Sequence, residues 1–215
     1  MSTPRPSPYV WVTWIAGILA GDDRCTFSPW FKANHYYTKR RRDGVPLEWK
    51  SLHDQMVDRR ASELVADGFR VWVEDQNAFR LKGEAATLGG KPDIIAAHAD
   101  GRRLVVDCKG GREKGADVWQ VLVYMLAAPR TLEHAKGGTV AGEVCYQGGR
   151  RIVDPSELSP DAVAAIVTLL RRLGASDPPT AAPSGRECAW CDIGAADCPD
   201  RTDAPAAAEA STSDF

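Results

Sequence analysis

Three separate stretches decide the fold: Lys91-Pro92-Asp93, Val105-Val106-Asp107-Cys108-Lys109, and Gln120-Val121-Leu122-Val123-Tyr124. Asp93 precedes one apolar run and Asp107 ends the next, 14 residues later, with the hairpin signal Asp100-Gly101 between them. Such a hairpin brings both carboxylates to one end of a sheet. Because side chains alternate along a strand, Asp107 and Lys109 point to the same face, and Val106 and Cys108 point to the other.

Two carboxylates and an ammonium group are unfavourable together in a protein interior unless a further charge joins them. A divalent cation supplies that charge, since Mg²⁺ is typically held by one or two carboxylates together with phosphate oxygens of a substrate. Such a cation polarises a phosphodiester and lowers the pKa of bound water. An exposed hairpin with a surface Asp–Lys pair is the simpler interpretation of Asp107 and Lys109 alone. The Pro92-Asp93 pair and the Gln-x-x-x-Tyr helix argue against it.

Together these motifs resemble the signature of the PD-(D/E)XK nuclease superfamily, and Gln120…Tyr124 is similar to the Gln-x-x-x-Tyr motif of its RecB-like branch. The resemblance implies an α/β fold with a restriction-endonuclease-like core, in which helices flank a central mixed sheet. It also implies a role for each motif residue: Asp93, Asp107 and the Cys108 carbonyl as metal ligands, Lys109 as the catalytic lysine, and Gln120 and Tyr124 as residues that brace the site or touch DNA. The last two share a helix face.

RecB-like nucleases also carry a histidine on the helix before the sheet, and His53 matches it. Imidazole suits Mn²⁺ better than Mg²⁺. Glu63 on the same helix is the competing candidate, and a satisfied, partly buried histidine is the simpler alternative.

The remaining elements follow from periodicity, turn residues and capping residues. The expected segments are an extended piece becoming a short helix over Val10–Leu19, helices over Pro29–Tyr37, Leu47–Ala66, Ala116–Ala127 and Ala162–Leu173, and strands over Phe69–Glu74, Ala78–Lys82, Lys91–Ala97, Arg103–Lys109, Val140–Tyr146 and Arg151–Val153. The segment Ala78–Lys82 is expected to return as a second strand after a turn at Asp75–Asn77. This order predicts a mixed α/β fold.

The six cysteines are unevenly placed. Cys188, Cys191 and Cys198 cluster near the C-terminus, and Cys25 is the best fourth thiol because Cys108 and Cys145 belong to strands. Four thiolates suit zinc or an iron–sulfur cluster. One distant cysteine with a C-terminal triplet resembles the iron–sulfur branch of RecB-like nucleases, although Thr26 and the triplet spacing depart from that pattern. The resemblance implies a [4Fe–4S] cluster that joins the N- and C-terminal segments; zinc stays the alternative.

Composition limits the class of protein. With 44% hydrophobic and 26% charged residues, the 215-residue chain is globular, and its net charge of −2 excludes a general DNA coat. The apolar stretch Val10–Ala20 is too short to span a bilayer, so a cytoplasmic protein with reduced cysteines is expected. We expect one domain over residues 1–199, an irregular linker near residues 175–186, and a disordered tail over residues 200–215.

A short aromatic and basic segment predicts contact with DNA. It comprises Tyr36, Tyr37, Lys39, Arg40, Arg41 and Arg42, in which cations can neutralise phosphates and rings can stack on unpaired bases. The sequence thus predicts a deoxyribonuclease for single strands or DNA ends, with Mg²⁺ or Mn²⁺ and an iron–sulfur cluster. Its expected setting is CRISPR adaptation, phage recombination or repair, with an integrase or helicase as partner. The alternative is a DNA-binding assembly subunit of weak activity with the same fold.

Overall fold

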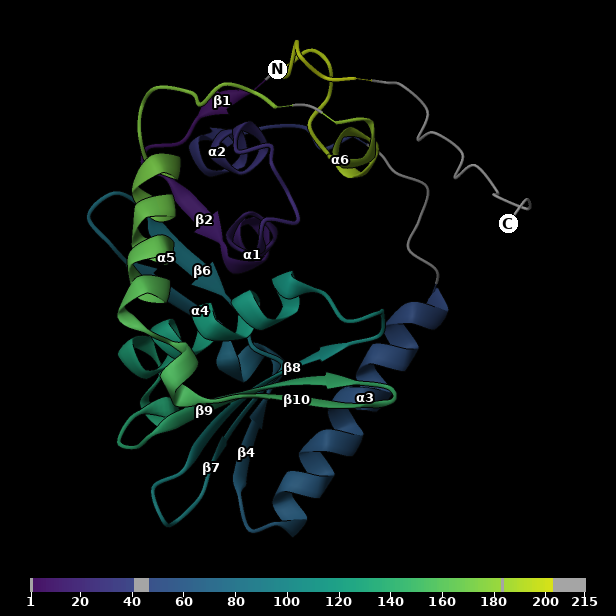
Figure 1. Cartoon of the computed structure of the whole chain (residues 1–215), viewed down its shortest axis with the longest axis vertical. Helices are drawn as coiled ribbons and strands as arrows, with labels where there is room; N and C mark the ends of the chain where they lie inside the picture. The colour runs from purple at the N-terminus through teal and green to yellow at the C-terminus, as the bar shows by residue number, and fades with distance from the viewer. Residues whose placement is uncertain (1, 41–46, 183, 203–215) are drawn as a thin grey trace, which may run out of the picture.

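The computed structural model describes residues 2–40, 47–182 and 184–202. Its centre is a five-stranded mixed sheet of order β10-β9-β8-β7-β4, in which β8 and β9 are parallel and the other neighbours antiparallel (Figure 1). The strands are β4 Arg70–Val73, β7 Ile94–Ala97, β8 Arg103–Lys109, β9 Val140–Tyr146 and β10 Gly149–Val153. This arrangement confirms the predicted α/β fold with a central mixed sheet.

Helices cover both faces of this sheet. On one face α3 (Leu47–Ala66) packs Met56 and Leu64 against Ile94 and Val106, all buried. On the other face, α4 (Gly115–Thr131) packs against the alternate residues of the same strands, such as Ile95 and Val105 (Figure 1). Burial on both faces explains why β7 and the middle of β8 are continuous apolar runs without an alternating polar face.

A second, three-stranded sheet lies beside the first. It has the order β2-β6-β5, with β2 (Tyr9–Trp11) parallel to β6 (Thr87–Gly90) and β5 (Phe79–Lys82) antiparallel to β6. The segment Ala78–Lys82 contains a strand, as predicted, and this strand pairs with β6, whereas β4 pairs with β7. A 3₁₀ turn over η1 (Glu74–Asn77) redirects the chain away from β4.

The N-terminal elements pack above α4. The chain forms α1 (Val12–Ala20) and α2 (Phe27–Asn34), and a two-stranded sheet of β1 (Thr3–Pro4) and β3 (His35–Tyr36). Short 3₁₀ turns, η2 (Glu133–Ala135) and η3 (Pro155–Glu157), follow α4 and β10. The helix predicted over Pro29–Tyr37 therefore ends earlier, because His35 has extended backbone.

The C-terminal part returns to the N-terminal elements. Ser159 caps α5 (Pro160–Leu173) through a 3.2 Å bond from the Ala162 N–H to its Oγ, as its sequence predicts. A short helix, α6 (Gly185–Trp190), begins inside the segment expected to be irregular and lies beside α2 (Figure 1). Among the residues described, no helix is both long and apolar enough to cross a membrane.

Candidate active site

The two predicted carboxylates are brought together by strand register. Ile94 on β7 pairs with Val106 on β8, so Asp93 and Asp107 stand at neighbouring positions at the same end of the antiparallel pair. Both are buried, with 8% and 2% of their surface exposed. Buried carboxylates require partners, and each of them has a different set.

Asp93 is held by a backbone donor and a histidine. Its Oδ2 accepts a 2.6 Å hydrogen bond from the Cys108 N–H and lies 3.2 Å from His53 Nε2. The bond to Asp93 raises the pKa of His53 against the opposing effect of burial. The structure therefore brings His53, and not Glu63, to the carboxylates.

Asp107 belongs to a chain of side chains from β8 and α4. Its Oδ2 lies 2.6 Å from Lys109 Nζ, and its Oδ1 accepts a 2.9 Å bond from Gln120 Nε2. Lys109 Nζ also donates to Gln120 Oε1 at 3.0 Å. Gln120 Nε2 further donates to Tyr124 OH at 3.2 Å, and that hydroxyl donates to the Lys91 carbonyl at 3.3 Å. All five predicted side chains therefore lie in one site with His53.

Burial is the largest influence on the pKa values of Asp107 and Lys109. Burial raises the pKa of Asp107 to about 7, although Lys109 opposes the shift; Asp93 adds to it. For Lys109, burial acts against the ammonium, but Asp107 outweighs it and raises the pKa. A second cation would relieve the crowding of the two carboxylates, so the residues fit a divalent metal ion. Asp93, Asp107 and His53 are donors that Mg²⁺ or Mn²⁺ accepts, and among the described residues His53, Asp54 and Glu74 are the group whose ligand atoms all lie within 4.8 Å of one another.

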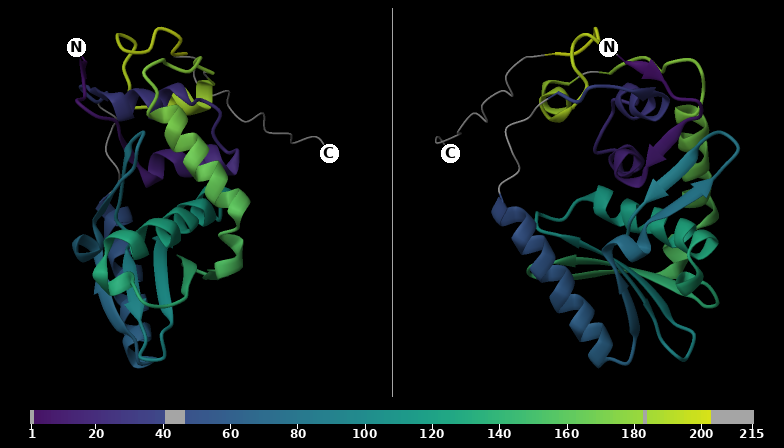
Figure 2. Two further views of the ribbon diagram at one scale, coloured as in Figure 1. Left: turned by 90° about the vertical axis from the view of Figure 1, so that its left-hand side faces the viewer. Right: turned by 180° about the vertical axis from the view of Figure 1, so that it is seen from behind.

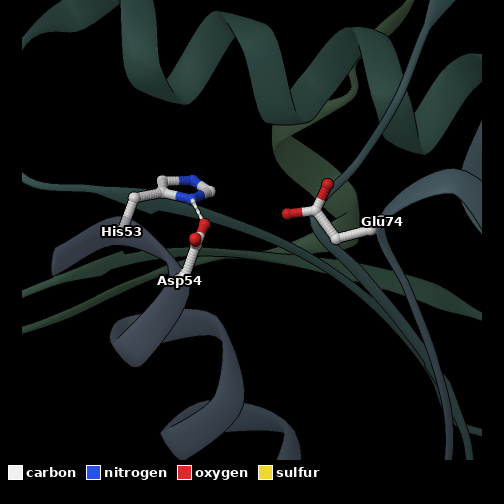
Figure 3. Close-up of side chains that lie close together, drawn as sticks. All are labelled: His53, Asp54 and Glu74. Carbon is white, nitrogen blue, oxygen red and sulfur yellow. Dashed lines mark ion pairs between the residues drawn. The ribbon is translucent and has the colours of Figure 1, made fainter. Parts of the chain in front are cut away.

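Two acidic residues near His53 were missed by the sequence analysis. His53, Asp54 and Glu74 each offer a ligand atom within 4.8 Å of the others, and Figure 3 shows the His53 imidazole next to the Asp54 carboxylate, with the Glu74 carboxylate facing both. His53 Nδ1 lies 3.8 Å from Asp54 Oδ1. Glu74 has a φ of 52°, which is uncommon for a residue other than glycine. No sequence pattern signals that conformation, so the position of Glu74 could not be predicted.

Lys91 and Asn77 shape the approach to Asp93. Lys91 Nζ lies 2.8 Å from Glu74 Oε2 and 2.9 Å from Asp75 Oδ1. Asn77 is fully buried, and its Nδ2 donates to the carbonyls of Trp72 and Pro92 at 2.9 and 3.2 Å. These bonds fasten the η1 turn to the residue before Asp93. The sequence indicated only a turn at Asn77.

A buried ion pair fixes α3, the helix that carries His53. Arg60 Nε and Nη2 donate to the two carboxylate oxygens of Glu143 on β9 at 2.7 and 2.8 Å. Arg60 is 5% exposed and Glu143 1% exposed. Glu63, the competing candidate for the site, instead accepts a 2.9 Å bond from Arg60 Nη1 and faces Arg150.

The four predicted cluster cysteines also converge. Burial is the main cause that raises the pKa of the Cys198 thiol. Cys25, Cys191 and Cys188 raise this pKa further, because they lie close enough to Cys198 to interact with it. The Cys25 N–H donates to Glu187 Oε1 of α6 at 3.0 Å, and Ser28 Oγ lies 3.5 Å from Cys191 Sγ. Thiols from both ends of the chain thus lie in one neighbourhood, although among the described residues no three of them have sulfur atoms within 4.8 Å of one another. Cys108 and Cys145 stand elsewhere, opposite each other on β8 and β9.

The predicted DNA-contact segment is only partly open. Tyr36 is 52% exposed and Lys39 is exposed, but Tyr37 OH donates to Asp192 at 3.1 Å. Arg40 Nη2 donates to the Ala189 carbonyl at 2.7 Å, which joins it to α6. Arg41 and Arg42 lie outside the described residues.

The site geometry agrees with an independent family comparison. The model of the PD-(D/E)XK nuclease superfamily matches residues 23–196. The chain belongs to the PD-(D/E)XK nuclease superfamily. The matched range includes all five predicted side chains of the carboxylate site, which come from the residue before β7, from β8 and from α4. The superfamily assignment implies nuclease activity dependent on a divalent metal ion.

Two further comparisons add little to the superfamily assignment. A solved structure titled "Crystal structure of SSO0001" is similar in fold, with a TM-score of 0.48 and 13% identity over 93% of this chain and 90% of that chain. Comparison with curated proteins gives no match.

Proposed function

We propose that this PD-(D/E)XK protein is a deoxyribonuclease that hydrolyses phosphodiester bonds at single strands or DNA ends. The convergence of Asp93, Asp107 and Lys109, with Gln120 bonded to the last two, carries the proposal. Retention of all three charged residues argues against the alternative, a DNA-binding assembly subunit of weak activity.

Each residue of the site has a separate role in the proposed reaction. A cation held by Asp93, Asp107 and His53 would polarise the scissile phosphate and lower the pKa of a bound water. Lys109 is kept protonated by Asp107, so its ammonium can face the charge that develops on the phosphate. Gln120 holds both Lys109 and Asp107 by hydrogen bonds. The Tyr124 hydroxyl accepts a bond from Gln120 and donates one to the Lys91 carbonyl, so it holds the Gln120 amide in place. The Cys108 carbonyl is proposed as a further ligand.

The metal requirement is tested on labelled single- and double-stranded DNA. Purified protein should cut with added Mg²⁺ or Mn²⁺ and stop cutting with a chelator. Asp93→Asn should lower cleavage by about 100-fold, because it removes a charged ligand. Asp67→Asn, at an exposed position after α3, is the matched control and should cut normally. Cleavage unaffected by both the chelator and Asp93→Asn would contradict the proposal.

We further propose that Cys25, Cys188, Cys191 and Cys198 hold a [4Fe–4S] cluster with a structural role. The convergence of four thiols beside Glu187 and α2 supports it. Such binding couples to folding, and the polar segment around α6 has few buried apolar side chains to hold it, Ile193 being one. Zinc bound by the same four thiols is the alternative.

Metal content separates these two metals. Anaerobically purified protein should be brown, absorb near ~400 nm, as expected for a thiolate-held iron–sulfur cluster, and contain iron and sulfide. Cys191→Ser should lose the colour, whereas Cys145→Ala, which changes a strand cysteine outside the set, should keep it. Colourless protein that contains zinc would contradict the iron–sulfur proposal and show a zinc site instead.

The same proposal places the enzyme in the cytoplasm, where thiols stay reduced. It assigns the enzyme to DNA-end processing in CRISPR adaptation, phage recombination or repair, with an integrase or helicase as partner. This assignment rests on the resemblance of the cysteine pattern to the iron–sulfur branch of RecB-like nucleases.

A further inference from the structure

The β2-β6-β5 sheet has one apolar and one polar face. Alternate residues on all three strands, including Val10, Leu88 and Phe79, are buried in the main core. The other face carries Tyr9 and Trp11 on β2, Thr87 and Gly89 on β6, and Arg80 and Lys82 on β5. We call these six residues the platform. The β5–β6 hairpin projects at the edge of the molecule (Figure 2), and its turn meets the C-terminal end of α5, where Gly174 packs against Ala85.

The platform presents packed aromatic rings to solvent. Tyr9 and Trp11 meet edge to face with ring centroids 5.8 Å apart, and Trp11 is 38% exposed. Tyr9 lies directly over Gly89, where an added Cβ would come within 2.0 Å of its hydroxyl. Glycine at this position therefore lets the ring lie across the strand. The rings are held in place before any ligand arrives, which lowers the entropy lost on binding.

Cations flank these rings. The Arg80 guanidinium lies 5.8 Å from the centre of the Tyr9 ring. Arg80 and Lys82 are both exposed, and neither makes an ion pair with any residue in the described ranges. Exposed rings combined with cations that lack an acidic partner are complementary to a ligand with flat aromatic groups and repeated negative charges.

The platform leads directly to the active site. Strand β6 ends at Gly90, and the chain then runs through Lys91 and Pro92 to Asp93. Asp93 is four positions after Gly89, which is at most about 13 Å of extended chain. The face is thus continuous with the carboxylate site, and Lys91 lies between them.

We propose that the platform binds single-stranded DNA and guides it into the active site, an inference that rests on the proposed nuclease function. Unpaired bases would stack on Trp11 and Tyr9 while Arg80 and Lys82 contact the phosphates. A duplex keeps its base faces stacked inside, so the platform favours single strands over blunt duplex. Binding of bases on sheet aromatics is a general mode of single-strand recognition.

Binding is measured by fluorescence anisotropy with a labelled oligothymidylate of about 20 nucleotides, a length that spans a typical site. The Lys109→Ala background prevents cleavage during the measurement. Trp11→Ala should weaken binding by about tenfold, the effect expected for loss of one stacked base, while Trp11→Phe should keep most of the affinity. Arg80→Gln with Lys82→Gln should lower the slope of log affinity against log salt by about 1.4, about 0.7 for each cation.

Two controls test specificity. Arg59→Gln with Lys136→Gln removes two exposed cations that lie outside the platform, on α3 and after η2, and should leave affinity and salt slope unchanged. A blunt hairpin duplex should bind more weakly than the single strand and respond little to Trp11→Ala.

The outcomes separate this inference from the proposed function. Unchanged single-strand binding by both Trp11→Ala and the Arg80/Lys82 variant overturns the platform, even if the wild-type protein cuts DNA. Loss of binding in these variants supports the platform, even if the wild type does not cut. If the variants instead reduce self-association in sedimentation while DNA binding stays unchanged, the face is a contact between copies and the inference is wrong.

Discussion

Gln120 is the residue on which the candidate site depends most, although no proton is expected to pass through it. Its amide holds Lys109 through one atom and both Asp107 and Tyr124 through the other. The amide is 7% exposed, so water cannot replace these bonds. A motif that a sequence shows only as Gln-x-x-x-Tyr thus acts by fixing the acid and the lysine relative to each other.

Gln120→Leu should lower single-turnover cleavage by about 10- to 100-fold, the usual effect of removing a group that orients metal ligands. The affinity for DNA should change little, because the amide holds other side chains. Gln147→Leu, in the exposed turn between β9 and β10, is the matched control. Equal cleavage by both variants would show that Gln120 does not position the site.

Asp107 predicts a pH dependence of stability in metal-free protein. Burial raises its pKa from 3.8 to about 7, so the folded state holds a proton that the unfolded state has released. Stability is therefore lost as pH rises from about 4 to about 7. The melting temperature of wild type should fall more over this range than that of Asp107→Asn. A steeper fall in Asp107→Asn than in wild type would contradict the shift.

Site residues that belong to a sequence motif could be predicted. Site residues that reach their position only through an unusual backbone conformation or through burial were missed. Asp93, Asp107 and Lys109 follow from strand alternation and one hairpin. Glu74 reaches His53 only because its backbone adopts a positive φ, and Asn77 matters only because it is buried against distant carbonyls. Neither the positive φ of Glu74 nor the burial of Asn77 can be recognised from a periodic sequence pattern.

At the scale of elements, α3 is fastened to the sheet by the Arg60–Glu143 pair, seven residues along from His53. Two charges in a nearly dry setting are stable only together. Local periodicity predicted α3, β4, β8 and α4, but β6 was missed because Thr87-Leu88-Gly89-Gly90 has a single large apolar residue. Because β6 was missed, the partner of β5 could not be predicted, although the two strands form a local hairpin.

Arg60→Leu should lower the free energy of unfolding by about 3–5 kcal/mol, since it leaves Glu143 charged and buried. The double variant Arg60→Leu with Glu143→Leu should recover part of that loss. Urea titration measures both, and Arg59→Leu at the exposed neighbouring position should have little effect. A double variant as unstable as the sum of the single ones would show that the pair is not coupled.

At the scale of the whole molecule, the two ends of the described chain meet at the cysteines. Lys32 on α2 pairs with Asp192 at 2.8 Å, and Glu187 accepts from the Arg24 N–H at 2.9 Å. The sequence predicted this meeting from cysteine spacing and family resemblance. It gave no sign of α6, because the helix is short and follows a segment rich in proline and alanine.

Cys25→Ser should therefore loosen both ends together. Hydrogen exchange should rise in residues 24–40 and 184–201 of the variant, because loss of one ligand releases a metal site that joins them. Exchange in β7 and β8 should stay close to wild type. A rise limited to the C-terminal segment would contradict a shared metal site.

The central claim is that Asp93, Asp107 and Lys109 form a metal-dependent nuclease site. The most direct measurement is the single-turnover cleavage rate of labelled single-stranded DNA with Mn²⁺ for wild type, Lys109→Ala and the exposed-lysine control Lys136→Ala. The account predicts that wild type and Lys136→Ala cut at the same rate, and that Lys109→Ala is slower by about 100-fold or more. Cleavage by Lys109→Ala at the wild-type rate would contradict it.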